Sequence, residues 1–535
     1  MGLLDLFALD GRRNLLDEAH LGIANWAMTV GVPYRDVGSV KGLFAPPCAS
    51  SDFLLEVRFF GEKAPTTEYT WLPFEVIRRG YLEGLEIESR LVLPPEGRGG
   101  LLALTVSNPG PKPVSVPVQF VVRGGFGYEA FWEFSYPTCT DPTDVISTGS
   151  LLLRRNDAGA LALVTDLAGM SWLGNADHWE GRLELAAGQT CTFHLAFALG
   201  LEAEAGSHCQ ALLADPATTL TNTECDWEAL TADLFDRLPR LEASDERLVK
   251  WYNRSLVHLL LNQWHISELV LNPYYSTGGI NGGCFCCYLW DFGEAWELLP
   301  LFDPAASRAH IKQFLASDMT SHFAFTPVTG EAFGPWYPVN QEKLVHLIYY
   351  YVLLTGDTTF LHELVARRSV LDHVVYHATY GDNLAQPARL IDYGTGNNHL
   401  ELRKSYRYDN VLPDLNGRRC TTYQLAAKLC RLGGRDSQVF EARASELAAV
   451  VKAQLWDPEI RWFHNLDPAG GKHTRYTVQL FKLIGGGALD AEEEAGLISH
   501  LNEEEFLSDW GLHSLSKQDE AYDQIDIDKD RKSVV

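Results

Sequence analysis

The sequence is poor in basic residues and contains no long apolar run. Its 535 residues include 44 Lys and Arg against 70 Asp and Glu, which gives a formal net charge of −26. Such a charge repels nucleic-acid phosphates and anionic lipid headgroups, so neither nucleic acid nor membrane is an expected partner. No apolar stretch approaches the roughly 20 residues of a membrane span, and the start is acidic where a signal peptide would be basic. The sequence predicts a soluble, cytoplasmic protein.

A regular framework of cysteine pairs is also absent. The ten cysteines are scattered, apart from the cluster Cys284, Cys286 and Cys287, and this pattern favours reduced thiols. The cluster has neither the spacing of about two to four residues nor the second ligand pair of a structural zinc site. The histidines show no metal-ligand spacing either. We therefore expect no metal and no cofactor.

Two hydrophobic periods divide the chain. Between about 50 and 200, short runs alternate every second residue and are bounded by Gly, Pro or Asn, as in strands with one buried face. After about 225 the period lengthens to that of amphipathic helices. A length of 535 residues with 46% hydrophobic content also favours two domains. We predict an antiparallel β-sandwich followed by paired helices. The alternating runs are 52–60, 85–94, 101–110, 114–122 and 190–199.

Helix boundaries are marked by local signals in the second half. Asp303 suits an N-cap and Pro304 the first helical turn. The predicted helix 340–357 closes with Gly356, which suits a left-handed C-cap, and a further helix is expected over 358–379. Later helices are expected near 418–432, 436–456, 474–484 and 490–503. From residue 245 onward about nine helices are expected, joined by loops in which binding sites usually lie.

Four segments resemble the motifs of one enzyme superfamily. YLWDFGEAWELLPLFDP at 288–304 is similar to the Trp-Asp motif of the six-hairpin glycosidases, which include trehalases, the processing α-glucosidase family and bacterial mannosylglycerate hydrolases. RLIDYGTGNNHLELR at 389–403 resembles the loop that carries their catalytic Asp. VLPDLNGRRCTTYQLAAKL at 411–429 resembles their Asp-Leu-Asn helix, and WGLHSLSKQDEAYDQIDID at 510–528 the segment before their last hairpins. The resemblance implies a β-sandwich before an (α/α)6 toroid and an inverting glycosidase activity.

The resemblance also implies domain limits. We expect a β-sandwich over 1–225, a linker helix over 226–243 and the toroid over 244–528. A toroid has six helical hairpins, so the expected helices leave it truncated at its C-terminal end. The last residues, DRKSVV at 530–535, match the translation of a common sequencing-adapter read. We therefore expect 529–535 to be non-native, the chain to be a bacterial gene fragment, and the family's general base to lie beyond its end.

The catalytic acid is expected in the second of these segments. Glycosidic cleavage needs a carboxylic acid that protonates the leaving oxygen, and inversion needs a carboxylate roughly 6.5–9.5 Å away that activates water. By resemblance, Asp392 is the general acid; the alternative is that Asp392 only bonds a turn in a Gly- and Asn-rich loop. Glu401 is the second choice of acid, and its alternative is an exposed ion pair with Arg403 or Lys404.

Other side chains suit sugar binding. Tryptophan offers a flat face to the C–H side of a pyranose, and amides and carboxylates bond its hydroxyl groups. The alternatives are core packing for each tryptophan, an N-cap for Asp291, and a solvated turn for the loop residues. The predicted substrate-binding residues are Trp290, Asp291, Trp336, Gln341, Tyr393, Asn398, Asp409, Asp414 and Asn416.

Three functions remain open on the sequence. The first is a glycoside hydrolase that cleaves a small glycoside or oligosaccharide with water as the nucleophile and no cofactor. The second is a disaccharide phosphorylase of the same layout, in which inorganic phosphate replaces the base. The third is a non-catalytic carbohydrate-binding or scaffold protein. The Asp-Leu-Asn resemblance and the lack of a clear basic phosphate pocket favour the hydrolase.

Overall fold

A computed structural model describes residues 3–12, 22–51, 55–128, 138–173, 178–277, 285–395, 408–509 and 511–522. The chain divides into two compact units, Met1–Cys287 with Thr326–Gly330, and Tyr288–Phe325 with Glu331–Val535. The limits at 225 and 243 expected from the sequence stay predictions. Among the helices that these ranges contain, none is long and apolar enough to cross a membrane.

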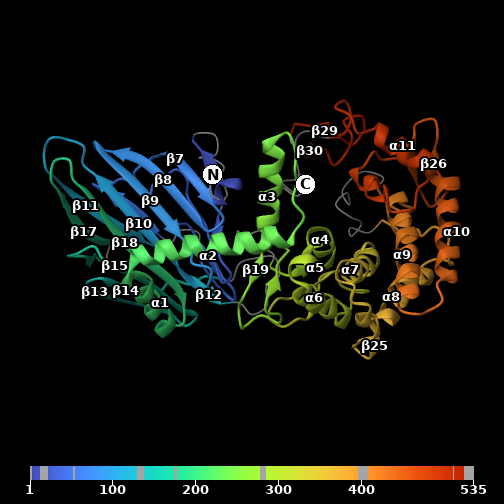
Figure 1. The fold of residues 1–535 in the computed structure, drawn as a ribbon, viewed down its shortest axis with the longest axis horizontal. Coiled ribbons are helices and arrows are strands. Elements are labelled where there is room, and N and C mark those ends of the chain that lie inside the picture. Colours follow the sequence, from blue (N-terminus) through green and yellow to red (C-terminus); the bar gives the residue numbers. More distant parts are fainter. Residues whose placement is uncertain are drawn as a thin grey trace. The chain divides into compact units, whose positions relative to one another are not determined.

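Among the described residues of the first unit, strands β1 to β18 form three antiparallel sheets (Figure 1), and β19 (Gln263–Trp264) pairs with β20 (Tyr274–Tyr275) in a separate two-stranded sheet. Their order is β1-β7-β8-β9-β10-β18-β15-β14-β13 in the largest sheet, β16-β17-β11-β6 in the second and β12-β5-β4-β3-β2 in the third. The strands are β1 (Leu9–Gly11), β2 (Ile23–Ala24), β3 (Thr29–Val30), β4 (Leu43–Ala45), β5 (Cys48–Ser50), β6 (Leu55–Phe59), β7 (Thr66–Leu72), β8 (Glu75–Leu82), β9 (Leu85–Val92), β10 (Gly99–Ser107), β11 (Val114–Val122), β12 (Phe126–Tyr128), β13 (Asp144–Thr148), β14 (Leu151–Asn156), β15 (Gly159–Thr165), β16 (Ser171–Leu173), β17 (His178–Leu185) and β18 (Thr190–Gly200).

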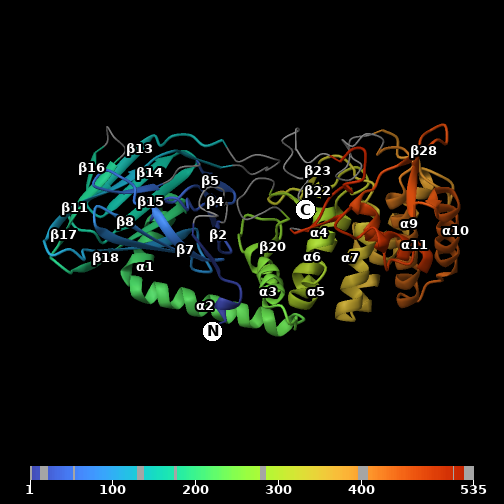
Figure 2. The ribbon, with the colours of Figure 1, turned by 90° about the horizontal axis from the view of Figure 1, so that it is seen from above.

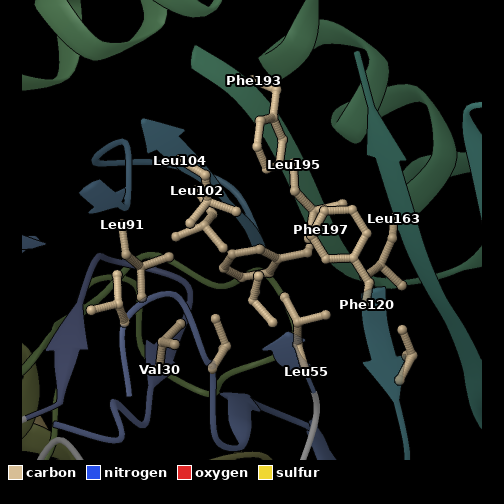
Figure 3. Packing of buried hydrophobic residues seen from close by; sticks show 14 of the residues in the cluster. Val30, Leu55, Leu91, Leu102, Leu104, Phe120, Leu163, Phe193, Leu195 and Phe197 are labelled. Carbon is tan, nitrogen blue, oxygen red and sulfur yellow. The ribbon is translucent and has the colours of Figure 1, made fainter. Parts of the chain in front are cut away.

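The alternation seen in the sequence is the alternation of buried and exposed faces. In β9, Leu85 and Ile87 are buried and Glu86 between them is exposed. The buried faces meet in one core, in which the Phe120 ring of β11 lies 6.4 Å from that of Phe193 in β18 (Figure 3). Because β11 and β18 belong to different sheets, two sheets pack face to face as a sandwich. Each fully buried Leu or Phe of this core contributes roughly 1.5–3 kcal/mol.

Two helices cover and follow the sandwich. The inner face of α1 (Glu202–Ala214), with Cys209 and Leu212, packs on small side chains of β15 and β18 such as Ala162 and Ala198. Because alanine side chains are small, α1 can approach β15 and β18 closely at this position. In α2 (Pro216–Arg237), the Trp227 ring stacks on Phe74 with centroids 5.0 Å apart, and its Nε1 donates to the Leu93 carbonyl at 3.1 Å. The helix α3 (Glu246–Leu261) follows.

Helices dominate the second unit. Among the described residues, α7 packs against α4, α6, α8 and α9, and α9 packs against α7, α8, α10 and the 3-10 helix η5. The helices α4, α7 and α9 thus contact one another in succession, and α6, α8 and α10 pack beside them (Figure 2). The elements are α4 (Leu289–Ala295), α5 (Leu299–Phe302), α6 (Pro304–Ala316), α7 (Asn340–Thr355), α8 (Val370–Thr379), α9 (Pro413–Leu432), α10 (Gln438–Leu455), η5 (Val478–Leu483) and α11 (Ala491–Ser499).

The local signals for helix ends are confirmed. Asp303 caps α6 by accepting a hydrogen bond from Ala306 N at 2.9 Å, and Pro304 occupies the first turn. Gly356 ends α7 with a φ of 71°, and its N–H donates to the Val352 carbonyl. These ends could be predicted because each depends on a few neighbouring residues.

One expected helix is shorter than predicted, and another is not an α-helix. The segment 358–379 contains the 3-10 helix η3 (Thr358–His362) and the hairpin strands β24 (Leu364–Val365) and β25 (Arg368–Ser369) before α8 begins. The segment 474–484 ends the strand β28 (Lys472–Thr474) and then forms η5 instead of an α-helix. In both places a side-chain cap starts a new element, Ser369 for α8 and Thr477 for η5.

Candidate active site

The Trp-Asp segment forms the short helix α4. Tyr288 occupies its N-cap position, so Asp291 lies inside the first turn and is not the cap. Asp291 is exposed, whereas Trp290 is half-buried with its ring centroid 6.4 Å from that of Tyr337. The ring of Trp290 therefore contributes to packing, as the alternative interpretation of this residue expects. Trp290, Tyr337 and Tyr393 pack against a cluster of Val339, Tyr408, Leu412, Leu415 and Leu515.

Asp392 lies in a turn with an exposed carboxylate. Its Oδ1 accepts hydrogen bonds from Gly394 N at 2.8 Å and from Asn410 Nδ2 at 3.1 Å. The backbone holds this turn as well, since Tyr393 N donates to Asn410 O at 2.9 Å and Asn410 N donates to Gly394 O at 2.7 Å. The turn contacts agree with the structural interpretation of Asp392, and its role as an acid stays a prediction.

Asn416 fixes the residue before Asp392. It is fully buried in the first turns of α9, where its Oδ1 accepts from Ile391 N at 2.8 Å and its Nδ2 donates to Ile391 O at 3.2 Å. The same Nδ2 donates to Leu412 O at 2.9 Å. These hydrogen bonds join the Asn416 amide to protein backbone groups, so Asn416 positions the Asp392 turn. Its predicted contact with substrate is not tested by them.

Asp414 is also buried at the start of α9. Its Oδ2 accepts a hydrogen bond from the Tyr408 hydroxyl at 2.7 Å, and Oδ1 has no hydrogen-bond partner among the described residues. Burial raises the pKa of Asp414, although Tyr408 and Arg418 act in the opposite direction. A proton is therefore held more readily on this carboxyl group than on an exposed aspartate. Asp409, another predicted binding residue, is half-buried.

A small pocket lies between α7, α8 and α9. Its volume is about 30 Å³, and it brings together three of the predicted residues, Trp336, Gln341 and Tyr393. Trp336 Nε1 donates to Gln341 Oε1 at 3.0 Å, and the Trp336 ring lies 5.9 Å from that of Tyr380. The pocket combines aromatic walls with polar groups, as carbohydrate sites do. The lining residues are Trp336, Pro338, Gln341, Glu342, His377, Ala378, Tyr380, Gly381, Leu384, Ile391, Tyr393, Leu415, Arg418, Arg419 and Thr422.

Ion pairs between helices form one wall of this pocket. Glu342 of α7 accepts from Arg418 Nη1 of α9 at 3.1 Å, and its carboxylate lies 3.4 Å from Lys343 Nζ. Burial would raise the pKa of Glu342, but Lys343 and Arg418 outweigh burial and lower it. Lys343 Nζ also lies 2.9 Å from Glu294 of α4, whose pKa falls to about 2 because Lys343 and Lys482 outweigh its burial. Both carboxylates are therefore ionised partners of cations at neutral pH.

His377 of α8 completes the buried polar lining. Burial, helped by His373 and Arg368, lowers the pKa of His377 to about 3, so its ring is neutral at neutral pH. Its Nδ1 has no hydrogen-bond partner in the described part of the chain. A neutral, unpartnered ring nitrogen at a pocket wall can donate to or accept from a ligand hydroxyl.

The sequence-based set misses four of the polar residues in this pocket, Glu342, His377, Arg418 and Arg419. One signal for Arg418 was present, because Asp414, Arg418 and Thr422 recur every four residues and so share one face of α9. Glu342 gave no such signal, since it lies 76 residues from its partner Arg418.

Two predicted residues lie outside the described residues. Asn398 and Glu401 fall in the segment 396–407, and so does His399. Among the His, Cys, Asp and Glu residues that are described, no group of three or more is arranged to hold a metal ion. Cys286 and Cys287 are buried, and the Cys287 thiol donates to the Tyr275 carbonyl at 3.8 Å.

Comparisons with known proteins find similarity at the level of structure. No family model matches the sequence, and no curated protein matches it. A bacterial glucoamylase solved in complex with acarbose has a TM-score of 0.59 and 9% identity, covering 95% of this chain and 84% of its own. A human-microbiome protein assigned as a kojibiose phosphorylase has a TM-score of 0.47 and 9% identity, covering 86% and 72%. A family GH78 rhamnosidase of Bacillus sp. GL1 has a TM-score of 0.40 and 12% identity, covering 80% and 40%.

At such low identity, the similarity to the glucoamylase concerns the fold alone. In the present chain antiparallel sheets come first and helices follow, and this layout matches the glucoamylase over 95% of the chain. The predicted fold class is confirmed: the chain has a glucoamylase-like layout of a β-sandwich followed by helices of an (α/α)6 type.

Proposed function

We propose that the chain is a glycosidase in which Asp392 protonates the leaving oxygen of a small glycoside or oligosaccharide. One observation carries the proposal: the exposed carboxylate of Asp392 is adjacent to Tyr393, a wall of the pocket, and is oriented by Asn410. A carboxyl group fixed beside an aromatic and polar pocket is the arrangement that general acid catalysis needs. The glucoamylase of similar fold was solved in complex with acarbose, and this supports a carbohydrate as the ligand of the present chain.

The proposed step is a direct displacement. The proton of the Asp392 carboxyl group passes to the glycosidic oxygen as the bond between that oxygen and the anomeric carbon breaks. Water forms the new bond to the anomeric carbon and gives its proton to a second carboxylate. That base is not assigned among the described residues, and an inverting reaction would place it roughly 6.5–9.5 Å from the acid.

The pocket residues would position the sugar. Trp336 and Tyr380 present rings to the pocket, and the Gln341 amide bonds Trp336 Nε1 and so fixes the indole. Because hydrogen bonds already fix the Trp336 indole and the Asp392 carboxylate, these groups need less reorganisation when a sugar binds. A cytoplasmic location stays a proposal from the sequence.

The test is sugar release from α- and β-linked disaccharides, with and without inorganic phosphate, by the full-length protein and by its Asp392→Asn variant. We expect turnover to fall by at least about 100-fold in the variant, the usual effect of removing a general acid. The matched control is Asp436→Asn, an exposed aspartate beyond the far end of α9 that bonds Gln438 N. The control should keep the wild-type rate.

The other outcomes separate the alternatives. Turnover that requires phosphate would identify a phosphorylase. Turnover that persists in Asp392→Asn would remove Asp392 from the acid role and favour Glu401. Sugar binding without turnover across the panel would favour the non-catalytic binding protein.

A further inference from the structure

Arg418 presents an unused edge of its guanidinium group. The residue is 5% exposed, and its Nη1 is occupied by Glu342 Oε2 at 3.1 Å. Among the described residues neither Nε nor Nη2 has a hydrogen-bond partner, although both atoms are buried. These two nitrogens share one side of the planar group, and their hydrogens point in parallel toward a common acceptor. Buried N–H groups are costly to leave unpaired, so this edge is suited to a ligand.

The size of the pocket limits what that ligand can be. Arg418 lines a space of about 30 Å³. One water needs roughly 10–15 Å³, so the space accepts a small substituent but not a whole pyranose ring. The rings of Trp336, Tyr380 and Tyr393 line the same pocket and offer faces against which a sugar ring can pack. A ring at these walls would send one substituent toward Arg418.

The charges around the pocket favour an anionic substituent. Glu342 is compensated from two sides, by Arg418 and by Lys343, so it does not act as an isolated negative charge. Arg419 lines the pocket as well and lies 3.6 Å from Asp382, which also accepts from Arg443 at 2.8 Å. Among the described residues, the lining of the pocket itself contains two cations, Arg418 and Arg419, and one carboxylate, Glu342, although the chain as a whole carries a net charge of −26.

Two further titratable groups face Arg418 and fit the same conclusion. Asp414 is one turn earlier on α9, and burial raises its pKa, which lowers its tendency to carry a charge. His377 on α8 is neutral at neutral pH. His377 therefore adds no charge to the pocket, and the Oδ2 atom of Asp414 is occupied by the Tyr408 hydroxyl, which donates to it at 2.7 Å.

We propose that this pocket binds an oxyanion through Nε and Nη2 of Arg418, either a carboxylate carried by the sugar substrate or inorganic phosphate. Two oxygens of one anion match the two parallel donors, whereas a single hydroxyl fills only one of them. The inference rests on the proposed function, because it assumes that the aromatic walls receive a carbohydrate. Arg418 would act as a specificity residue, held in orientation by Glu342.

Binding measured without turnover tests this inference apart from the proposed function. The full chain carrying Asp392→Asn is titrated by calorimetry with glucuronate, galacturonate, glucose, galactose and inorganic phosphate. We expect a uronate or phosphate to bind at least about 10-fold more tightly than the neutral sugars. A uronate advantage assigns the anion to the substrate, and phosphate binding without a uronate advantage assigns it to phosphate. Equal weak binding of all five probes would overturn the inference, even if the chain hydrolyses neutral disaccharides.

Three variants test whether the anion binds at Nε and Nη2 of Arg418. Arg418→Lys keeps a cation beside Glu342 but lacks two parallel donors, so the anion should bind about 10-fold more weakly. Arg431→Lys is the matched control, an exposed arginine of the same helix that pairs with Glu441, and should bind like the parent. Ala378→Val narrows the pocket from α8 without touching the ion pairs and should also weaken binding.

Folding of each variant is checked by circular dichroism before titration. If Arg418→Lys fails to fold, Ala378→Val decides, because it leaves Arg418 and Glu342 in place. Unchanged anion affinity in a folded Arg418→Lys or Ala378→Val variant would overturn the inference.

Discussion

The side chain of Asn416 bonds both backbone groups of Ile391, accepting from its N–H at 2.8 Å and donating to its carbonyl at 3.2 Å. The two residues are 25 positions apart, and the contact joins the first turns of α9 to the residue before Asp392. A buried amide that satisfies both backbone groups of one residue fixes the position of the segment as well as its stability.

Replacement of this amide should therefore affect stability and activity together. Asn416→Ala leaves the Ile391 N–H and carbonyl without their partner, and we expect the free energy of unfolding to fall by about 1–3 kcal/mol. We also expect the rate of sugar release to fall at least about 10-fold, because the Asp392 turn is displaced. Chemical denaturation and kinetics measure both effects. The exposed Asn383 offers a control, since Asn383→Ala should change stability by less than about 0.5 kcal/mol.

Asn410 combines a left-handed backbone with a bond to Asp392. Its φ is 59°, a conformation that glycine adopts freely and alanine resists. Asn410→Gly and Asn410→Ala both remove the bond to Asp392 Oδ1, so we expect the same loss of activity in both. The alanine variant should be less stable than the glycine variant by about 1 kcal/mol in denaturant unfolding. Wild-type activity in either variant would show that this bond does not position the acid.

The neutral His377 makes the folded state sensitive to acid. Burial lowers its pKa to about 3, whereas an unfolded histidine titrates near 6.5. Below about pH 6.5 the histidine is protonated in the unfolded state but stays neutral in the folded state. The free energy of unfolding therefore decreases as the pH falls. Between pH 8 and pH 5 this one residue accounts for about 2 kcal/mol. Between pH 8 and pH 5, the free energy of unfolding of His377→Gln should therefore decrease by about 2 kcal/mol less than that of the parent. Equal decreases in the two proteins would show that the His377 ring takes up the proton in the folded state.

Replacing either of two glycines by alanine should change the stability of the fold in opposite directions. Gly356 ends α7 with a φ of 71°, so Gly356→Ala places alanine in the left-handed region and should destabilise by about 1 kcal/mol. Gly206 lies inside α1, and a Cβ added there meets no atom within 4 Å. Gly206→Ala should stabilise by roughly 0.5–1 kcal/mol. Thermal denaturation of both variants measures the pair, and a shift of the same sign in both would contradict the assignment.

The fold was predictable where the determining residues are neighbours. Asp303 and Gly356 mark helix ends from one turn of sequence, and alternation over β9 marks a strand from eight residues. The hairpin within 358–379 was missed because Ala366 and Arg367 carry no turn signature, yet both have positive φ values of 47° and 70°. Sequence patterns favour Gly or Asn in such turns.

The candidate site was predictable in place but not in its partners. Resemblance located Asp392, Tyr393 and Asn416 in one region. It did not show that Asn416 would hold Ile391 or that Arg418 would pair with Glu342 across 76 residues. Such contacts depend on how α7, α8 and α9 pack. A sequence pattern within one helix does not indicate which residues of a neighbouring helix it will contact.

The ion pairs that join Glu294, Lys343, Glu342 and Arg418 have a consequence for how this chain diverges from its relatives. Removing one partner leaves a buried charge without compensation, which costs several kcal/mol, whereas replacing the group together can be neutral. Substitutions at these four positions should therefore be correlated across homologous chains. Joint variation of α4, α7 and α9 at these positions would identify homologous chains even where overall sequence identity is low.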